Sequence, residues 1–179
     1  MRKSAYGNIL EVSSYAGKIL LENGAEIYRV EQTVTHICRA YGIDQCDCFA
    51  TPTAIIISVI GKGGEVHSVV RRITSRRVNL RKVELINEFS RNIGQASSSF
   101  DEIKRQLKQI ENLSSYPLLW TAVTAGIGTA AFTVIFGGGL WNFICGLFAG
   151  ALIHLLITKI SDLGTGTFFT NLIGGAVSA

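Results

Sequence analysis

The fold is decided by the stretch YPLLWTAVTAGIGTAAFTVIF, residues 116–136. These 21 residues carry no charge. As an α-helix they would extend about 31 Å at 1.5 Å per residue, which matches the hydrocarbon core of a bilayer. Tyr116 and Trp120 stand near its beginning, where amphipathic aromatic rings favour the membrane interface. The stretch is therefore predicted to be a membrane-spanning helix.

Two more apolar stretches follow it. Residues 140–158 form a second predicted span, which starts beside Trp141 after a turn of three glycines, residues 137–139. Residues 164–179 have the composition of a third span but are too short to cross a bilayer. We expect a transmembrane α-helical bundle that is incomplete here, either because the chain is truncated or because another subunit completes it.

The charge distribution divides the chain in two. The 179 residues include 17 Lys or Arg and 13 Asp or Glu, a net charge of +4, but only Lys159 and Asp162 lie beyond residue 115. Soluble domains usually carry charge on about a quarter of their residues, so residues 116–179 do not have the composition of a soluble domain. They are also rich in Leu, Ile and Phe, which argues against disorder. The prediction is a soluble head, residues 1–115, and a membrane domain, residues 116–179.

Basic residues near the spans predict the orientation. Lys104, Arg105 and Lys108 precede the first span and Lys159 follows the second, whereas the glycine turn carries no basic residue. The positive-inside rule then puts the head in the cytoplasm. This predicts a multi-pass protein of the cytoplasmic (inner) membrane.

The head is predicted to be an α+β domain. Apolar residues recur at helical spacing over residues 7–23 and 25–41. The β-branched run 54–60 and the run 66–73 flank a Gly-rich turn, which is typical of a β-hairpin. Helical spacing returns over residues 80–93, after an Asn79 cap, and from residue 100, after a Ser99 cap. The expected order is two helices, a β-hairpin and two helices.

Several function classes lack their signatures. The phosphate-loop pattern GxxxxGK[ST] is absent. Cys46 and Cys48 could hold a metal only with a further ligand such as His36, so buried or free thiols are favoured and no metal or cofactor is predicted. No aromatic residue interleaves the basic residues of segment 71–82, which favours a face near anionic lipid headgroups over nucleic acid.

Polar residues at membrane depth are candidates for a transport path. His154 is the ionisable residue well inside a span, and Asn142 and Asn171 carry amides. Such groups are costly in hydrocarbon and are often functional, although His154 could equally bond a neighbouring helix. The threonines Thr121, Thr124, Thr129, Thr133 and Thr170 are expected mostly to bond backbone carbonyls four residues back. Gly146 and Gly150 indicate close helix packing, within the chain or between copies.

The stretch LLENGAEIYRVE, residues 20–31, resembles the signature opening of the threonine/serine exporter family. Further matches follow in order over nearly the whole chain: ATPT at 50–53, Arg71-Arg72, Leu80 with Asn87 and Ser90-Arg91, and FGG at 136–138. The resemblance implies a cytoplasmic domain fused to a membrane domain that exports small amino acids such as threonine and serine. Some members of the family are split into two membrane polypeptides and are associated with dicarboxylate export.

Two departures from the family pattern matter. The family's membrane portion has more helices than this chain supplies, so a complete pathway would need further residues or a second membrane subunit. An acid often stands in the family where this chain has Asn142, which leaves the coupling ion open.

The resemblance also draws attention to Glu26, Arg29 and Glu31. Glu26 and Arg29 are three residues apart on a helix, so they could form an ordinary surface salt bridge contributing about 0–1 kcal/mol. Alternatively, Arg29 could bind the carboxylate of a substrate, or it could form a gate contact with the membrane domain. The two interpretations are left open.

The sequence thus predicts a secondary exporter subunit, without enzyme activity or cofactor, that moves threonine, serine or related small carboxylates. The substrate would pass near Asn142, His154 and Asn171, with the Glu26–Arg29–Glu31 face as the cytoplasmic entry or gate. The expected partners are the lipid bilayer, the substrate and a second membrane subunit or further copies, and no nucleic acid. The alternatives are a membrane-anchored binding or regulatory domain and, more weakly, a hydrolase using His36 or His67.

Overall fold

The computed structural model describes residues 2–94, 99–114, 116–162, 172 and 175. The chain divides into two compact units, Met1–Ser114 and Ser115–Ala179.

The N-terminal unit begins with two helices, α1 (Arg2–Glu22) and α2 (Ile27–Ala40). They are joined by a tight turn in which Gly24 has a φ of +91°, a conformation that glycine adopts without steric cost. The amide of Ala25 donates to the carbonyl of Leu20 at 3.0 Å, which closes the end of α1. The two helices contact each other, as expected for an antiparallel pair with a short connection.

Three antiparallel strands follow: β1 (Cys46–Thr51), β2 (Ala54–Ile60) and β3 (Val66–Arg72), in the order β1-β2-β3. The predicted hairpin is β2–β3, but the prediction of only two strands was wrong. β1 forms because its alternate residues Cys46, Cys48 and Ala50 turn towards the core while Asp47 and Phe49 are exposed. Its short, partly polar sequence has little of the β-branched character that identified β2.

Two more helices complete the unit, α3 (Leu80–Asn92) and α4 (Phe100–Glu111). Both predicted caps are confirmed. The side-chain oxygen of Asn79 accepts a hydrogen bond from the amide of Lys82 at 3.3 Å, and the hydroxyl of Ser99 accepts one from the amide of Glu102 at 3.3 Å. These bonds satisfy amides that have no partner within the helix.

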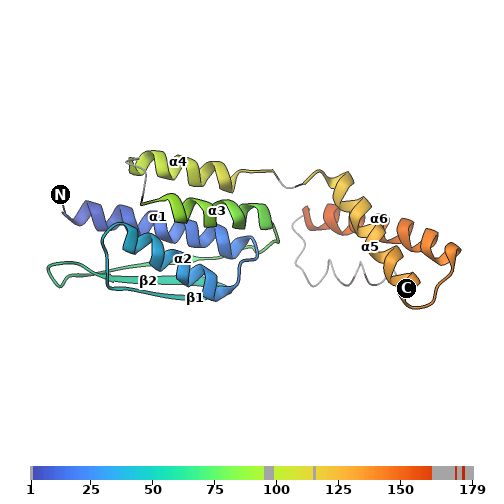
Figure 1. Cartoon of the computed structure of the whole chain (residues 1–179), viewed down its shortest axis with the longest axis horizontal. Helices are drawn as coiled ribbons and strands as arrows, with labels where there is room; N and C mark the ends of the chain where they lie inside the picture. Colours follow the sequence, from blue (N-terminus) through green and yellow to red (C-terminus); the bar gives the residue numbers. More distant parts are fainter. Residues whose placement is uncertain (1, 95–98, 115, 163–171, 173–174, 176–179) are drawn as a thin grey trace. The chain divides into compact units, whose positions relative to one another are not determined.

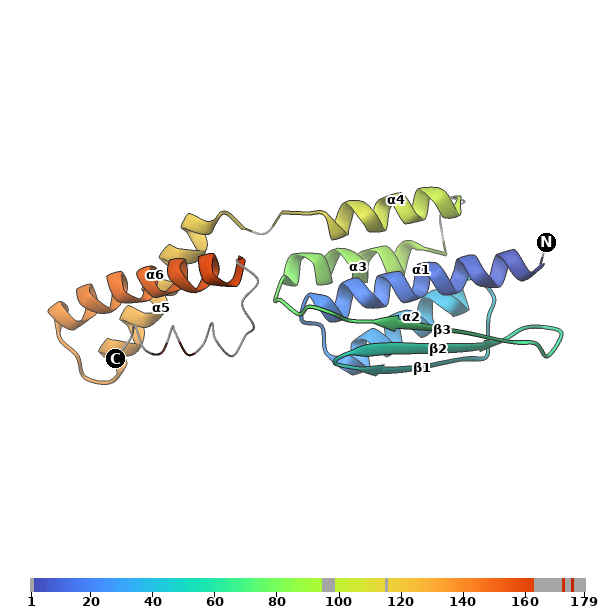
Figure 2. The same cartoon turned by 180° about the vertical axis from the view of Figure 1, so that it is seen from behind.

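The helices lie on one side of the sheet in two layers (Figures 1 and 2). α1 and α2 contact the strands, and α3 and α4 pack on the helices rather than on the sheet. Between the sheet and the first helical layer lies a core of fully buried aliphatic side chains, which includes Val12, Ile19, Leu20, Val30, Val34, Ile37, Ile55, Ile57 and Val59. The face of α2 that does not pack on the sheet contacts α3, and a groove lies between these two helices.

The C-terminal unit contains two described helices, α5 (Leu118–Ile135) and α6 (Leu140–Asp162). They contact each other and are joined by a turn at Gly137, whose φ is +85°. Leu118–Ile135 and Leu140–Ile160 are long and apolar enough to cross a membrane. The predicted third span, residues 164–179, lies outside the described residues apart from positions 172 and 175.

Glycines bring α5 and α6 close together. A β-carbon at Gly126 would lie 2.5 Å from the carbonyl oxygen of Leu147, and one at Gly146 would lie 3.3 Å from the α-carbon of Ala130. A β-carbon at Gly150 would collide with the hydroxyl of Thr129. The glycine pair Gly146 and Gly150 therefore packs within the chain, which decides between the two alternatives that the sequence left open.

Candidate functional site

The three candidate residues near the start of α2 have different surroundings. The carboxylate of Glu31 accepts a hydrogen bond from the backbone amide of Ala50 at 2.9 Å, which ties α2 to β1. Glu26 precedes the helix, and its side chain makes no capping hydrogen bond. Arg29 is exposed, and within the described residues no acidic side chain lies within ion-pair distance of it. The surface salt bridge with Glu26 that the spacing allowed is therefore not formed.

The bond between Glu31 and Ala50 can be tested by substitution. Ala50 is only 5% exposed, so Glu31→Ala should leave a buried amide without its acceptor and lower the free energy of unfolding by about 1–3 kcal/mol. Glu26→Ala, which removes a carboxylate without such a bond, should change it by less than about 0.5 kcal/mol. Thermal unfolding of the two full-length variants, followed by circular dichroism, measures the difference. Equal midpoints would show that the Glu31 carboxylate does not hold α2 on β1.

Arg29 lines an open groove of about 440 Å³ between α2 and α3, which we call the α2–α3 groove. Its α2 wall consists of Arg29, Gln32, Thr33 and His36. Its α3 wall consists of Asn87, Ser90 and Arg91. All seven are polar or basic, and none is acidic. The groove can therefore attract an anion and donate several hydrogen bonds to it.

The base of the groove is formed by two buried hydroxyl residues. Thr33 is 8% exposed and Ser90 is 6% exposed. The Ser90 hydroxyl donates to the carbonyl of Asn87 at 2.9 Å. The Thr33 hydroxyl has no hydrogen-bond partner among the residues that the structure describes. The Thr33 hydroxyl is thus a donor in the groove lining that is available to a ligand.

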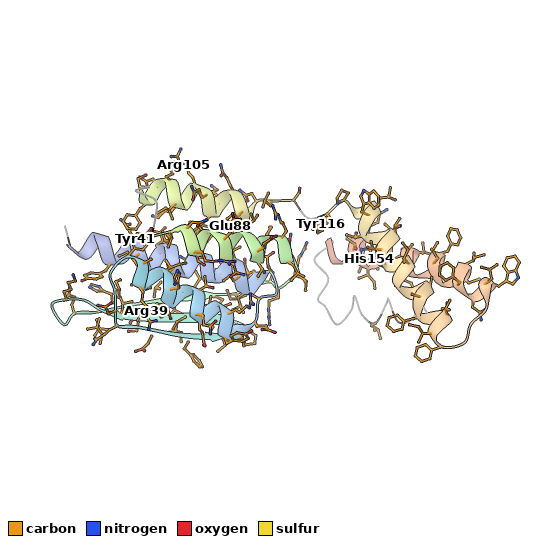
Figure 3. All side chains as sticks on the ribbon, viewed as in Figure 1. Arg39, Tyr41, Glu88, Arg105, Tyr116 and His154 are labelled. Carbon is orange, nitrogen blue, oxygen red and sulfur yellow. The ribbon has the colours of Figure 1, made fainter. Side chains whose placement is uncertain are left out.

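A second groove, of about 410 Å³, lies beside the first on the surface of α2. Gln32 and His36 line both grooves, and the second also includes Glu31 and Arg39. Arg39 lies on the exposed side of α2 (Figure 3). Four cationic or protonatable side chains, Arg29, His36, Arg39 and Arg91, therefore border the two grooves, against the single carboxylate of Glu31.

Sequence reasoning identified Arg29 as a site residue but not its companions in the groove. The polar residues on α2 recur at positions 29, 32, 33 and 36, and those on α3 at 87, 90 and 91. This spacing is that of one helix face, so each wall was visible in the sequence. Their meeting depends on the packing of two helices whose groove residues are more than fifty positions apart in the chain, and the spacing within each helix does not reveal this packing.

The polar candidates in the C-terminal unit do not lie at one depth. Asn142 is exposed in the first turn of α6, and His154 is half-buried twelve residues later. Twelve residues of helix correspond to about 18 Å along the axis. Asn171 lies outside the described residues. Asn142 and His154 can therefore line a path, but they cannot form a single binding site. Figure 3 labels His154.

Two of the four described threonines of α5 make the predicted bond to the carbonyl four residues back, and two bond the carbonyl three residues back. Thr124 and Thr129 donate their hydroxyls to carbonyls four residues back, of Trp120 and Ala125, at 3.0 Å in each case. Thr121 and Thr133 donate to carbonyls three residues back, at 2.9 and 2.7 Å. These hydroxyls are satisfied within their own helix. Thr170 lies outside the described residues.

Part of the basic segment 71–82 is engaged in contacts within the protein. Arg71 donates to the hydroxyl of Ser14 at 3.1 Å, and Arg76 donates to the carbonyl of Leu21 at 3.3 Å. Arg81 pairs with Glu84 at 2.8 Å. The segment therefore serves to hold α1 and β3 together, which reduces the charge that remains for lipid headgroups.

The carboxylate of Glu111 anchors the end of α4 on α1. It accepts hydrogen bonds from the hydroxyl of Tyr15 and from the ammonium of Lys18, the latter at 3.0 Å. Burial alone would raise the pKa of Glu111, but these hydrogen bonds and the charges of Lys18 and Lys82 outweigh it and hold the pKa below its usual range. Burial and the hydrogen bond to Glu111 raise the pKa of Tyr15, which keeps its hydroxyl protonated as a donor.

The three thiols of the N-terminal unit differ in pKa: a hydrogen bond with Cys46 lowers the pKa of the fully buried Cys38, whereas the pKa values of the other two are raised. Burial raises the pKa of Cys48 to about 12, and a hydrogen bond with Cys38 together with burial raises the pKa of Cys46. Among the described residues, no group of three His, Cys, Asp or Glu side chains is arranged to hold a metal ion. His36, considered in the sequence as their companion, borders the α2–α3 groove instead.

The chain therefore belongs to the class of proteins in which an α+β unit is followed by helices of membrane length. In this chain the α+β unit carries a polar, basic groove and two such helices follow it. A family model described as "Putative threonine/serine exporter" matches residues 11–179. The chain therefore belongs to the threonine/serine exporter family.

Curated relatives agree with this membership. The chain is 26% identical over 141 residues to a "Probable succinate transporter subunit YjjP" of Klebsiella aerogenes, covering 79% of this chain and 54% of the relative. The protein of the same name from Escherichia coli is 25% identical over 70% of this chain and 48% of the relative. A "Probable threonine/serine exporter" of Mycobacterium tuberculosis is 21% identical over 95% of this chain and 32% of the relative.

The chain spans about half the length of the YjjP relatives and about a third of the mycobacterial one. No solved structure matches it significantly.

Proposed function

We propose that this chain is a subunit of a secondary exporter in the cytoplasmic membrane, which moves threonine, serine or a related small carboxylate out of the cell. The observation that carries the proposal is the family match, because it extends over both the α+β unit and the two helices of membrane length. Export driven by an ion gradient fits a sequence without a nucleotide-binding loop.

The proposed orientation has the N-terminal unit in the cytoplasm. Lys104, Arg105 and Lys108 before α5, and Lys159 near the end of α6, support it under the positive-inside rule. In this arrangement Arg29 meets cargo on the cytoplasmic side, and Asn142, His154 and Asn171 border the path through the membrane. Glu31 contributes by holding α2 in position through its bond to the amide of Ala50. Glu26 lies directly before the first residue of α2, beside the proposed cytoplasmic entry.

A second membrane polypeptide is proposed as a partner. Two relatives are named as transporter subunits, and this chain spans about half of their length. Two described helices of membrane length also provide few walls for a polar path. The partner or further copies would supply additional helices around the path.

An efflux assay tests the proposed function. Cells that contain the complete system should be preloaded with threonine-containing dipeptides, serine or succinate, and should release at least one of these faster than cells without this chain. Arg29→Ala should slow that release while the protein remains in the membrane fraction. Unchanged efflux of all three compounds would overturn the exporter proposal.

The alternative of a membrane-tethered regulatory domain predicts a different outcome. If α5 and α6 only tether the N-terminal unit, replacing residues 118–162 with two unrelated apolar helices should preserve function. The exporter proposal predicts that efflux is lost in this chimera although the protein still reaches the membrane.

A further inference from the structure

We propose that the α2–α3 groove is a binding site for a small dicarboxylate, and that it selects a dianion over a zwitterionic amino acid. The role of this site as a receiver of cargo rests on the proposed export function. The binding itself follows from the groove's geometry and charge.

The first argument is the state of the two arginines. Arg29 projects from α2 and Arg91 from α3, so that each wall of the groove contributes one guanidinium. Within the described part of the chain neither has a carboxylate partner, and Arg91 makes one hydrogen bond, from Nε to the carbonyl of Asn87 at 3.3 Å. Lys18 and Lys104, by contrast, are paired with Glu111 at 3.0 Å and with Glu11 at 2.6 Å.

Unpaired guanidiniums on facing walls suit a ligand with two carboxylates. A guanidinium presents parallel N–H donors that match the two oxygens of a carboxylate. A four-carbon dicarboxylate has one such group at each end, so it can engage both arginines at once. The groove volume of about 440 Å³ is within the range of small-molecule sites.

The neutral groups of the groove add directional donors between the two charges. Thr33 lines the groove, and its hydroxyl has no partner among the described residues. The side-chain amides of Gln32 and Asn87 line the same groove. The Thr33 hydroxyl and these amides can each donate a hydrogen bond to an oxygen of an incoming carboxylate.

The lining also explains why a zwitterion should bind less well. The ammonium group of an amino acid is best stabilised by a carboxylate, and the groove lining contains no acidic residue. The nearby carboxylates lie outside the groove. Glu31 accepts a hydrogen bond from the amide of Ala50 at 2.9 Å and lines the second groove. Glu88, which is labelled in Figure 3, lines a separate groove between α3 and α4. Two arginines would repel an ammonium group.

The experiment measures binding to the full chain purified in detergent, by isothermal titration with succinate, threonine and acetate at low ionic strength. Succinate should bind saturably and at least about ten-fold more tightly than threonine or acetate. Arg29→Gln and Arg91→Gln should each weaken succinate binding by about ten-fold or more. The matched control is Arg105→Gln, an exposed arginine on α4 outside the groove, which should bind within about two-fold of the wild type.

Three results would overturn the proposal. They are the absence of saturable succinate binding, threonine binding as tight as succinate binding, and wild-type affinity in both groove variants. The last result would assign binding to another part of the chain. Failure of the export function is distinguishable, because succinate binding that depends on Arg29 and Arg91 without efflux overturns export alone. Efflux without such binding overturns the groove site alone.

Discussion

Replacing Gly126 by leucine is expected to separate α5 from α6. A β-carbon at this position would lie 2.5 Å from the carbonyl oxygen of Leu147 and 3.3 Å from the β-carbon of Ala151. The first neighbour is backbone, which cannot rotate away, so the helices must move apart. Overpacking of this kind costs about 1–3 kcal/mol, and membrane helices depend on close packing between small residues.

The expected result is a marked loss of thermal stability in detergent and, if the chain exports its cargo, a loss of efflux. The matched control is Gly128→Leu, two residues away on the same helix, where a β-carbon would meet nothing within 4 Å. That variant should keep the wild-type unfolding midpoint within about 2 °C, because a surface change of this kind costs little. If both variants unfold at the same temperature, the interface between α5 and α6 is not the one described.

The contrast between these two glycines shows what the sequence could and could not predict about the membrane unit. The length and the absence of charge in residues 116–136 predicted a helix of membrane length, and α5 occupies Leu118–Ile135 of that stretch. Composition could not tell that Gly126 faces α6 and that Gly128 does not, because both lie in the same apolar run. Only the packing of the second helix distinguishes them.

The N-terminal unit gives the same lesson. Asn79 and Ser99 were predicted as caps because capping depends on a few neighbouring residues. β1 was missed because Cys46–Thr51 becomes a strand through pairing with β2, in the register Phe49 to Ile56, and not through its own propensity. The α2–α3 groove was missed for a related reason: Arg29 and Arg91 share a groove only after α3 has packed on α2.

Replacing Gly17 by valine is expected to be the most damaging single change in the N-terminal unit. Gly17 lies on α1 where this helix meets both α2 and the sheet. A β-carbon there would lie 2.9 Å from Cγ2 of Val34, 3.2 Å from Cδ1 of Ile55 and 3.5 Å from Cγ1 of Val30. Those three side chains are fully buried, so they have little room to yield, and valine adds two further methyl groups.

The predicted cost is about 1–3 kcal/mol or more, which should lower the unfolding midpoint of this unit by about 5 °C or more in the full-length protein. The matched control is Gly7→Val on the same helix, since a β-carbon at Gly7 would meet nothing within 4 Å. Valine and glycine differ by only a few tenths of a kcal/mol in helix propensity. Gly7→Val should therefore unfold within about 2 °C of the wild type, and equal losses in both variants would contradict the close approach of α1 to α2.

The same substitution also connects the core to the proposed binding site. Val30 and Val34 point from α2 towards Gly17, while Arg29 and Thr33, their neighbours in the chain, line the α2–α3 groove from the adjoining face of the helix. A valine that displaces α2 would therefore shift one wall of the groove relative to Arg91 on α3. Succinate titration of Gly17→Val at a temperature where it is still folded should show weaker binding than Gly7→Val. Identical affinities would mean that the groove does not depend on the seating of α2 against α1.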